Sequence, residues 1–250
     1  MSIVTQYHGE QDGRGLSSKM WEKIDVREIF SGGPAGFSRG YGFYDDFMDL
    51  GSIGRYTATK TGSATFALDD AEGGVALADS VSTSNGQGVN IQAAGATGEA
   101  FLTGTSQIMA FEARVKLADV STAPEFFLGL SEINTAIITS DANISANHIG
   151  FEITSSSATA IDFHAEVAGT RTSETGVHTF ADGTWVKLGF KVINRTRIEI
   201  WVDGVKNSTQ LTTGFPLVEM TPSLVCQTNA TTDPITHIDW WAAAVQLRAE

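Results

Sequence analysis

Cysteine and long apolar runs are the scarcest features of this sequence. Its 250 residues include one cysteine, Cys226, so an internal disulfide is excluded and we expect packing alone to stabilise the fold. No catalytic motif surrounds this thiol, which we interpret as a small core residue. No apolar run approaches the roughly 20 residues of a membrane-spanning helix, and residues 1–15 lack the apolar centre of a signal peptide. We therefore expect no membrane partner, no secretion, and synthesis in the cytoplasm.

Positive charge is scarce as well. Asp and Glu number 29 against 16 Lys and Arg, which gives a formal net charge of −13. Residues 1–40 are neutral, so the whole negative excess falls in residues 41–250. A surface of this sign repels phosphate backbones, and we expect no direct contact with nucleic acid.

Motifs for resident cofactors and for familiar catalytic sites are also absent. No two of His8, His148, His178 and His237 stand at a spacing typical of metal ligands, and the chain has no GxSxG, no P-loop and no GxGxxG turn before a helix. The run DANISANH (141–148) mixes Asp and Asn as a calcium loop does, but it lacks the EF-hand spacing and the closing Glu. We expect no cofactor, with a structural calcium ion as the alternative.

Three acids in the run WEKIDVREIF raise the question of a glycosidase site. Such sites place two carboxylates about 5 Å apart, usually on one face of one strand. Glu22, Asp25 and Glu28 stand at i, i+3 and i+6. On a strand Asp25 would point away from the other two, and on a helix the three form an ordinary exposed row. We therefore expect no catalysis at this segment.

Alternating apolar and polar residues dominate the chain after residue 44. The clearest runs are MAFEARVKL (109–117), TWVKLGFKVI (184–193) and RIEIWVDG (197–204), each typical of an antiparallel strand with one buried face. Asn194 and the pair Asp203-Gly204 mark hairpin turns between and after them. The same pattern predicts strands near 64–69, 74–79, 88–93, 126–131, 148–154, 160–167, 223–228 and 235–247. This rhythm predicts an all-β, two-sheet antiparallel jelly-roll sandwich over residues 44–250.

The composition differs before residue 44. Ser17 and Ser18 can cap a short helix over 19–30, and the Gly-rich, aromatic run SGGPAGFSRGYG follows. We interpret residues 1–43 as an N-terminal arm and linker that binds a neighbouring protein through its apolar side chains. The predicted partner-binding residues are Trp21, Ile24, Val26, Ile29, Phe30, Phe37, Tyr41 and Phe43.

One polar strand face remains a candidate contact for a glycan or an ion. In IDFHAEV, the residues Asp162, His164 and Glu166 share one face of a strand. This face is either a solvated surface, an ion or sugar contact, or an acid/base set.

Two tryptophans are further candidates for sugar contact. Trp201 shares a strand face with acidic residues, and the adjacent Trp240 and Trp241 must point to opposite faces. Trp201 and Trp241 could stack on a sugar, unless the arm or a loop covers such outward rings.

The order of these segments resembles a known family. YDDFMDL (44–50) is followed by MAFEARVKLADV (109–120), then by DGTWVKLGFKVINRTRIEIWVDGV (182–205) and HIDWWAAAVQL (237–247). In this order they resemble the concanavalin A-like (laminin-G-like) jelly-roll structural proteins of tailed bacteriophages, and KMWEKIDVREIFSGGPAGFSRGYGFYDDF resembles the arm of that family.

The resemblance implies a non-enzymatic virion protein on the capsid surface, of the decoration or cement type. Such a protein would be made in the host cytoplasm and would bind the major capsid protein and neighbouring copies of itself, as a dimer or trimer, through its arm and sandwich edges. Many functions occur on this fold, so two alternatives stay open. The chain could be a carbohydrate-binding module that contacts surface glycans, or a glycosidase or lyase that uses the face of Asp162, His164 and Glu166.

Overall fold

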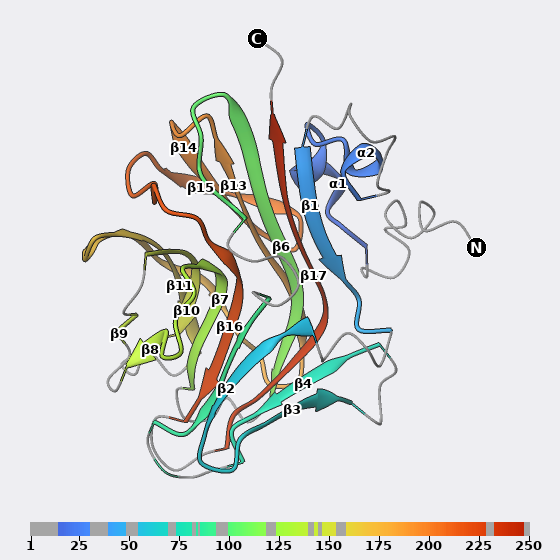
Figure 1. Cartoon of the computed structure of the whole chain (residues 1–250), viewed down its shortest axis with the longest axis vertical. Helices are drawn as coiled ribbons and strands as arrows, with labels where there is room; N and C mark the ends of the chain where they lie inside the picture. The colour runs from blue at the N-terminus through green and yellow to red at the C-terminus, as the bar shows by residue number, and fades with distance from the viewer. Residues whose placement is uncertain are drawn as a thin grey trace.

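The computed structural model of the chain describes residues 15–30, 40–48, 55–69, 74–81, 84, 86–93, 100–118, 124–139, 143–144, 147–153, 159–228 and 233–247. Within these ranges the fold is a sandwich of two antiparallel sheets, with two short helices on the outside of one of them (Figure 1). The predicted all-β jelly-roll class is confirmed.

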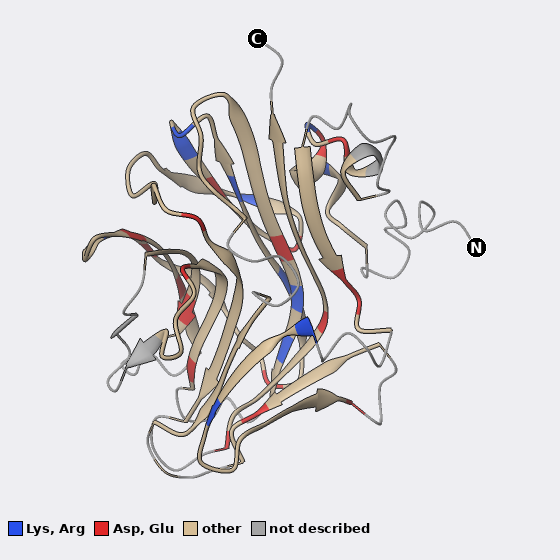
Figure 2. Cartoon of the chain, viewed as in Figure 1, with Lys and Arg blue, Asp and Glu red and all other residues tan. Residues whose placement is uncertain are grey.

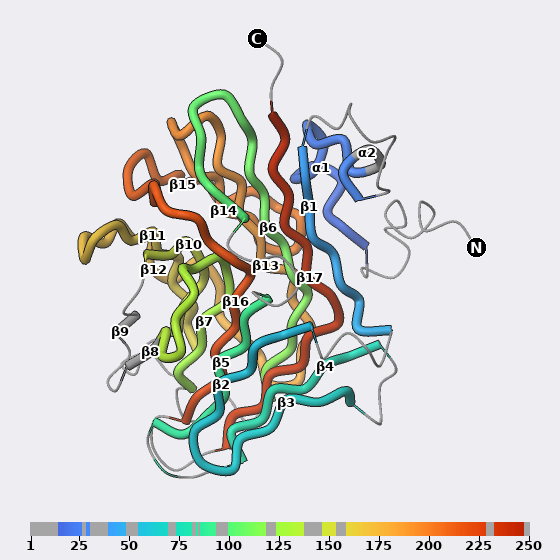
Figure 3. Tube along the Cα trace, in the orientation of Figure 1, coloured from blue at the N-terminus to red at the C-terminus, as the bar shows by residue number. Residues whose placement is uncertain are grey.

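The first sheet has eight strands. Its order is β15 (Val205–Leu211), β14 (Arg197–Val202), β13 (Trp185–Ile193), β6 (Gln107–Ala118), β17 (Ile235–Leu247), β4 (Ala76–Asp79) and β3 (Thr65–Leu68), and β1 (Gly40–Asp45) also pairs with β17. The trace in Figure 3 shows β1, the first described strand, running beside β17, the last one. β1 thus crosses the boundary at residues 43 and 44 that the sequence suggested between arm and sandwich.

The second sheet has seven strands. Its order is β12 (Thr170–Thr179), β11 (Ala160–Val167), β10 (His148–Ile153), β7 (Glu125–Ser131), β16 (Thr221–Gln227), β5 (Gly88–Gln92) and β2 (Thr57–Thr61). A separate two-stranded ribbon, β8 (Ile138–Thr139) and β9 (Asn143–Ile144), follows β7. Positive φ angles at Asn194 and Arg195, and at Asp203 and Gly204, form the two tight turns around β14, as the sequence predicted.

The core between the sheets is built from the alternating residues of the central strands. Phe111 of β6 stacks on Phe190 of β13 with ring centroids 5.5 Å apart, and Phe163 of β11 contacts Phe190 from the opposite sheet, also at 5.5 Å. Trp241 is fully buried in the same core. Its Nε1 donates to the hydroxyl of Tyr56 at 3.0 Å, and that hydroxyl donates to Oδ2 of Asp45 at 2.7 Å.

Two short helices form where the sequence predicted one. They are α1 (Ser18–Trp21) and α2 (Val26–Phe30). The chain breaks between them because the N–H of Asp25 donates to Oε1 of Gln246 on β17, at 2.6 Å, instead of to a helical carbonyl. Both helices lie on the side of the eight-stranded sheet that faces away from the other sheet (Figure 1). This break divides the single helix predicted over 19–30 into two.

Candidate functional site

The N-terminal segment covers an apolar area on the outward face of the eight-stranded sheet. Met20, Trp21 and Ile24 are almost fully buried there. The cluster also contains Leu16 and Ile29 from the N-terminal segment, and Ile108, Ala110, Trp201, Trp240, Ala242 and Ala244 from the sheet. We call residues 15–30 the docked arm. Its apolar contacts form a second core outside the sandwich.

A buried carboxylate fastens the docked arm. Glu112 of β6 is 1% exposed and accepts three hydrogen bonds from it. The N–H of Ser17 donates to Oε2 at 3.0 Å, Nε1 of Trp21 donates to Oε2 at 2.8 Å, and the Ser17 hydroxyl donates to Oε1. Burial raises the pKa of the Glu112 carboxyl, while the bonds from Ser17 and Trp21 oppose the rise. Nearby, Nζ of Lys191 donates to the carbonyl of Met20 at 2.7 Å.

The predicted partner-binding residues are therefore mostly in contact with their own chain. Trp21, Ile24 and Ile29 are buried, Val26 and Phe30 are half-buried against the same cluster, and Phe43 lies in the sandwich core. Tyr41 is 40% exposed, and Phe37 lies outside the described residues. In the isolated chain the described members of this set, Tyr41 excepted, offer little apolar surface to a neighbour. Their role in partner binding stays a prediction.

The two tryptophans proposed as sugar contacts are covered. Trp241 is 0% exposed within the core, and Trp201 is 7% exposed beneath the docked arm, with Nζ of Lys191 at 5.3 Å from its ring centroid. Trp240 points outward and stacks on Tyr44, so it lies opposite Trp241 as expected. Neither Trp201 nor Trp241 presents a ring face at the surface. The alternative, that the arm covers the outward rings, holds for Trp201 and Trp240.

The candidate polar triplet does share the outward face of β11, on the seven-stranded sheet. The pairing of β10 with β11 places a fourth group beside it, Glu152, whose side chain is 1% exposed. Oε2 of Glu152 lies 3.4 Å from Nε2 of His164 and 3.3 Å from Nη1 of Arg171. Nε of Arg171 donates to Glu166 at 3.0 Å, and Asp162 accepts the N–H of Gly176 at 2.7 Å.

Burial shifts the pKa values of the two central groups of this cluster, Glu152 and His164, in opposite directions. It raises the pKa of Glu152 to about 7 against the attraction of Arg171, and it lowers the pKa of His164 to about 4, with Arg171 adding to the effect. Both groups are thus largely neutral between about pH 5 and 6. Such a pair could exchange a proton, but the Glu152 side chain is closed to solvent and Glu166 is held by Arg171. We interpret the cluster as a structural network.

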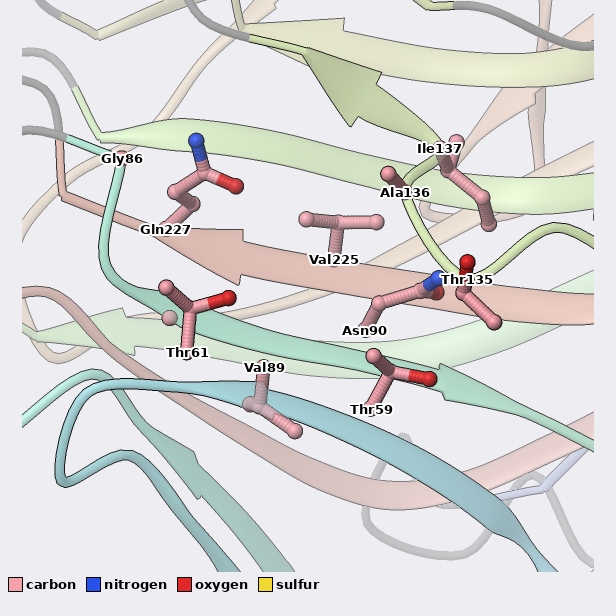
Figure 4. A pocket seen from close by; sticks show the side chains of 11 residues that line it. Thr59, Thr61, Gly86, Val89, Asn90, Thr135, Ala136, Ile137, Val225 and Gln227 are labelled. Carbon is pink, nitrogen blue, oxygen red and sulfur yellow. The ribbon is translucent and has the colours of Figure 1, made fainter.

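A pocket of about 350 Å³ lies on the same sheet, toward its other edge. Figure 4 shows its lining side chains on β2, β5 and β16 and on the loop after β7. The lining residues are Thr59, Thr61, Gly86, Gly88, Val89, Asn90, Thr135, Ala136, Ile137, Val225 and Gln227. None of them carries an ionisable side chain, so the pocket can bind a ligand but has no acid or base for catalysis. No local sequence pattern indicates this pocket, because its walls come from segments that are distant in the sequence.

The structure gives no support to a particular metal ion. Among the described residues no group of three or more His, Cys, Asp or Glu side chains could hold one, and the run 141–148, considered for the alternative of a calcium ion, lies partly outside them. Cys226 is buried, its Sγ donates to the carbonyl of Pro234 at 3.2 Å, and burial raises its pKa to about 12. No described helix is long and apolar enough to cross a membrane.

No protein-family model and no curated protein matches the chain. Its solved structural relatives include peanut lectin in complex with a 9-residue peptide, with a TM-score of 0.61 at 10% identity over 84% of this chain and 99% of the lectin. A Bacteroides ovatus family 16 glycoside hydrolase gives a TM-score of 0.57 at 12% identity over 80% of this chain and 99% of the enzyme.

A carbohydrate esterase of the Shiga toxin-encoding bacteriophage phi24B is also similar. It gives a TM-score of 0.51 at 17% identity, over 82% of this chain and 97% of the esterase. At such identities the similarity shows the fold, which is the jelly roll of concanavalin A-like lectins and family 16 glycoside hydrolases.

Proposed function

From this fold, we propose that the chain is a non-enzymatic structural protein of a bacteriophage virion, a decoration or cement protein on the capsid surface. The sequence resemblance to phage jelly-roll proteins over nearly the full chain is the observation that carries the proposal. A bacteriophage protein among the structural relatives is consistent with a phage origin, although its described activity is esterase chemistry.

The geometry supports a structural role in two ways. The docked arm is fastened by Glu112 and by an apolar cluster, so residues 15–30 form part of one folded body. In addition, the Glu152 side chain is buried within 3.4 Å of His164 and 3.3 Å of Arg171, and the described pocket has no titratable lining. In these two described sites an accessible acid and base do not stand together, which suits binding better than turnover.

The sheet edges are the surfaces through which we propose attachment. β15 ends the eight-stranded sheet with a largely exposed strand, and Val205 at its start is 70% exposed. An exposed edge carries unpaired backbone donors and acceptors that a capsid subunit or a second copy can extend. The docked arm contributes its polar side, on which Glu22 and Lys23 are exposed.

Mass spectrometry of purified virions tests this proposal. We expect the chain at a copy number comparable to that of the major capsid protein, or at a simple fraction of it set by capsid symmetry. In a binding assay with undecorated capsids, Val205→Lys is expected to weaken binding while Leu217→Lys, at another exposed apolar position, leaves it unchanged. Absence of the chain from virions would contradict the proposal.

Carbohydrate binding is the second candidate, and the pocket favours it. The pocket is lined by hydroxyl, amide and methyl groups, which is the mixture that sugar rings contact. Lectins with this fold, such as the lectin I of Ulex europaeus in complex with a fucose glycoside, show that the sandwich can carry such a site.

The third candidate, a glycosidase or lyase, would need Glu152 to reach a substrate. A turnover screen with Glu152→Gln as the inactive control tests it, and any activity lost in that variant would support the enzyme reading.

A further inference from the structure

We propose that the pocket between β2, β5, β16 and the loop after β7 binds a neutral, polyhydroxylated ligand such as a terminal sugar ring. This inference rests on the second candidate function and deepens it, because it names the site and the class of sugar. The pocket has a volume of about 350 Å³, which falls at the lower end of the range for small-molecule sites.

The walls of the pocket are fixed before a ligand arrives. Two amide side chains of β5 hold the loop over the sheet: Nδ2 of Asn90 donates to the carbonyl of Asn134 at 2.6 Å, and Oε1 of Gln92 accepts the N–H of Asn134 at 2.9 Å. Ile137 then packs on Phe127 and Val225. A preformed site avoids the entropy cost of ordering a loop on binding.

One acceptor in the lining lacks a partner. Asn90 is 7% exposed, and its Oδ1 has no hydrogen-bond partner among the described residues, while its Nδ2 is engaged. Figure 4 shows the Asn90 side chain reaching toward Thr135 from the floor strand β5. An unpaired buried acceptor costs about 1–3 kcal/mol. Oδ1 is closed to water in the free chain, so a ligand hydroxyl removes this cost only if the Asn90 amide turns toward the pocket.

The remaining lining defines which ligand fits. Thr59 and Thr61 of the edge strand contribute hydroxyls, Gln227 contributes an amide, and Val225 contributes methyl groups. An apolar ligand would bury these polar groups without partners, which is unfavourable. A polyol has hydroxyls for them and C–H groups for the methyls.

The surrounding charge argues against an acidic ligand. The lining carries no cation, and Gln227 donates to the carboxylate of Glu125 at 2.7 Å. Further acidic residues lie on β10 and β11, toward the opposite edge of the same sheet (Figure 2). A carboxylated sugar would meet repulsion here without a compensating Lys or Arg.

Methyl NMR on the full chain tests the site directly. The probes are neutral disaccharides of glucose, galactose, mannose and N-acetylglucosamine, and matched sugars that end in glucuronate or sialate. We expect at least one neutral sugar, at millimolar concentration, to shift the methyl signals of Val225 and Ile137 but not those of Val115 in the core. The acidic sugars should bind at least fivefold more weakly. Preferred binding of the acidic sugars would overturn the proposal.

Variants of the edge strand provide the second readout. Thr59→Trp fills the pocket and should abolish the shifts, and the near-isosteric double change Thr59→Val with Thr61→Val should weaken binding at least fivefold. Thr57→Val, on the same strand and outside the pocket, is the matched control and should bind normally. Sugar binding that survives Thr59→Trp would place the site elsewhere and overturn this inference while leaving carbohydrate binding standing. If no probe binds, both this inference and the proposal of carbohydrate binding are overturned. The proposal of a virion protein, which mass spectrometry of virions tests, is unaffected by that result.

Discussion

Nε1 of Trp21 donates a hydrogen bond to Oε2 of Glu112 at 2.8 Å, across 91 positions of the sequence. The bond joins the docked arm to the centre of the eight-stranded sheet, in a place closed to water. A buried carboxylate depends on such donors, because without them its charge would be left unsolvated.

Trp21→Phe should therefore destabilise the protein. The change keeps most of the aromatic packing and removes one N–H from Glu112, so we expect the free energy of unfolding to fall by about 1.5–3 kcal/mol. Urea denaturation measures it. Lys19→Gln, on the exposed side of α1, is the control and should change stability by less than about 0.5 kcal/mol. A cost for Trp21→Phe no larger than the control's would contradict the anchoring role of Glu112.

Removing residues 1–30 should expose the apolar surface of the eight-stranded sheet that the docked arm covers. Trp201, Trp240 and Ile108 would then face solvent, and Glu112 would lose its donors. We expect red-shifted tryptophan emission, binding of a hydrophobic dye and a lower midpoint of thermal unfolding. An unchanged midpoint with no dye binding would mean that the sandwich does not depend on the arm. Because truncation alters the fold in this way, point variants are the better test of capsid binding.

The pair of Glu152 and His164 should hide two opposing pH effects. A raised carboxyl pKa means that the native state holds a proton that the unfolded state releases, so Glu152 lowers stability as pH rises from about 4.5 to about 7. The lowered pKa of His164 has the opposite sign, so its contribution raises stability as pH rises from about 4 to about 6.5. Each is worth about 3 kcal/mol across its window, and the two largely cancel in the wild-type protein.

Single variants should reveal how each group makes the stability depend on pH. Relative to wild type, Glu152→Gln should become more stable as pH rises from 4.5 to 7, whereas His164→Gln should become less stable as pH rises from 4 to 6.5. Urea midpoints at half-unit pH steps measure both differences. Glu219→Gln, at an exposed position, should follow the wild-type curve. Parallel curves for all four proteins would show that the two groups titrate normally.

Tyr56→Phe should weaken the core network that connects β1 with β17. Its hydroxyl accepts from Nε1 of Trp241 and donates to Asp45, and Asp45 is 4% exposed. Removing the oxygen leaves both partners short of a bond, and we expect a loss of about 2–4 kcal/mol in the free energy of unfolding. Tyr41→Phe, at a 40% exposed position, is the matched tyrosine control and should cost less. Equal losses in the two variants would contradict the special role of Tyr56.

Most of the strands that the sequence predicted bury at least one apolar face. β6 and β13 alternate because every second side chain enters the core. The edge strands β2, β12 and β15 were missed, since runs such as TATKT and TRTSETGVHT place few apolar side chains inward and carry little periodicity. A buried face therefore made most strands recognisable, although the partly exposed edge strand β3 was predicted as well.

The candidate sites were less predictable because strand pairing creates them. Alternation was sufficient to place Asp162, His164 and Glu166 on one face, but Glu152 joined them through the register of β10 with β11. Trp201 reads as an outward ring on β14 and is nevertheless buried, because the docked arm lies over it. Relations of this kind join distant segments, and a single sequence does not encode them in any local pattern.

The central position of β17 also determines the order in which the molecule can be assembled on the ribosome. β6, β4 and β1 each pair with residues between 235 and 247, so all three keep an open edge until that segment has been synthesised. Such non-local pairing slows folding. The surface that receives the docked arm includes Trp240, Ala242 and Ala244. The arm, although translated before the strands it covers, can therefore dock only once β17 is in place, and its burial would report that the eight-stranded sheet is complete.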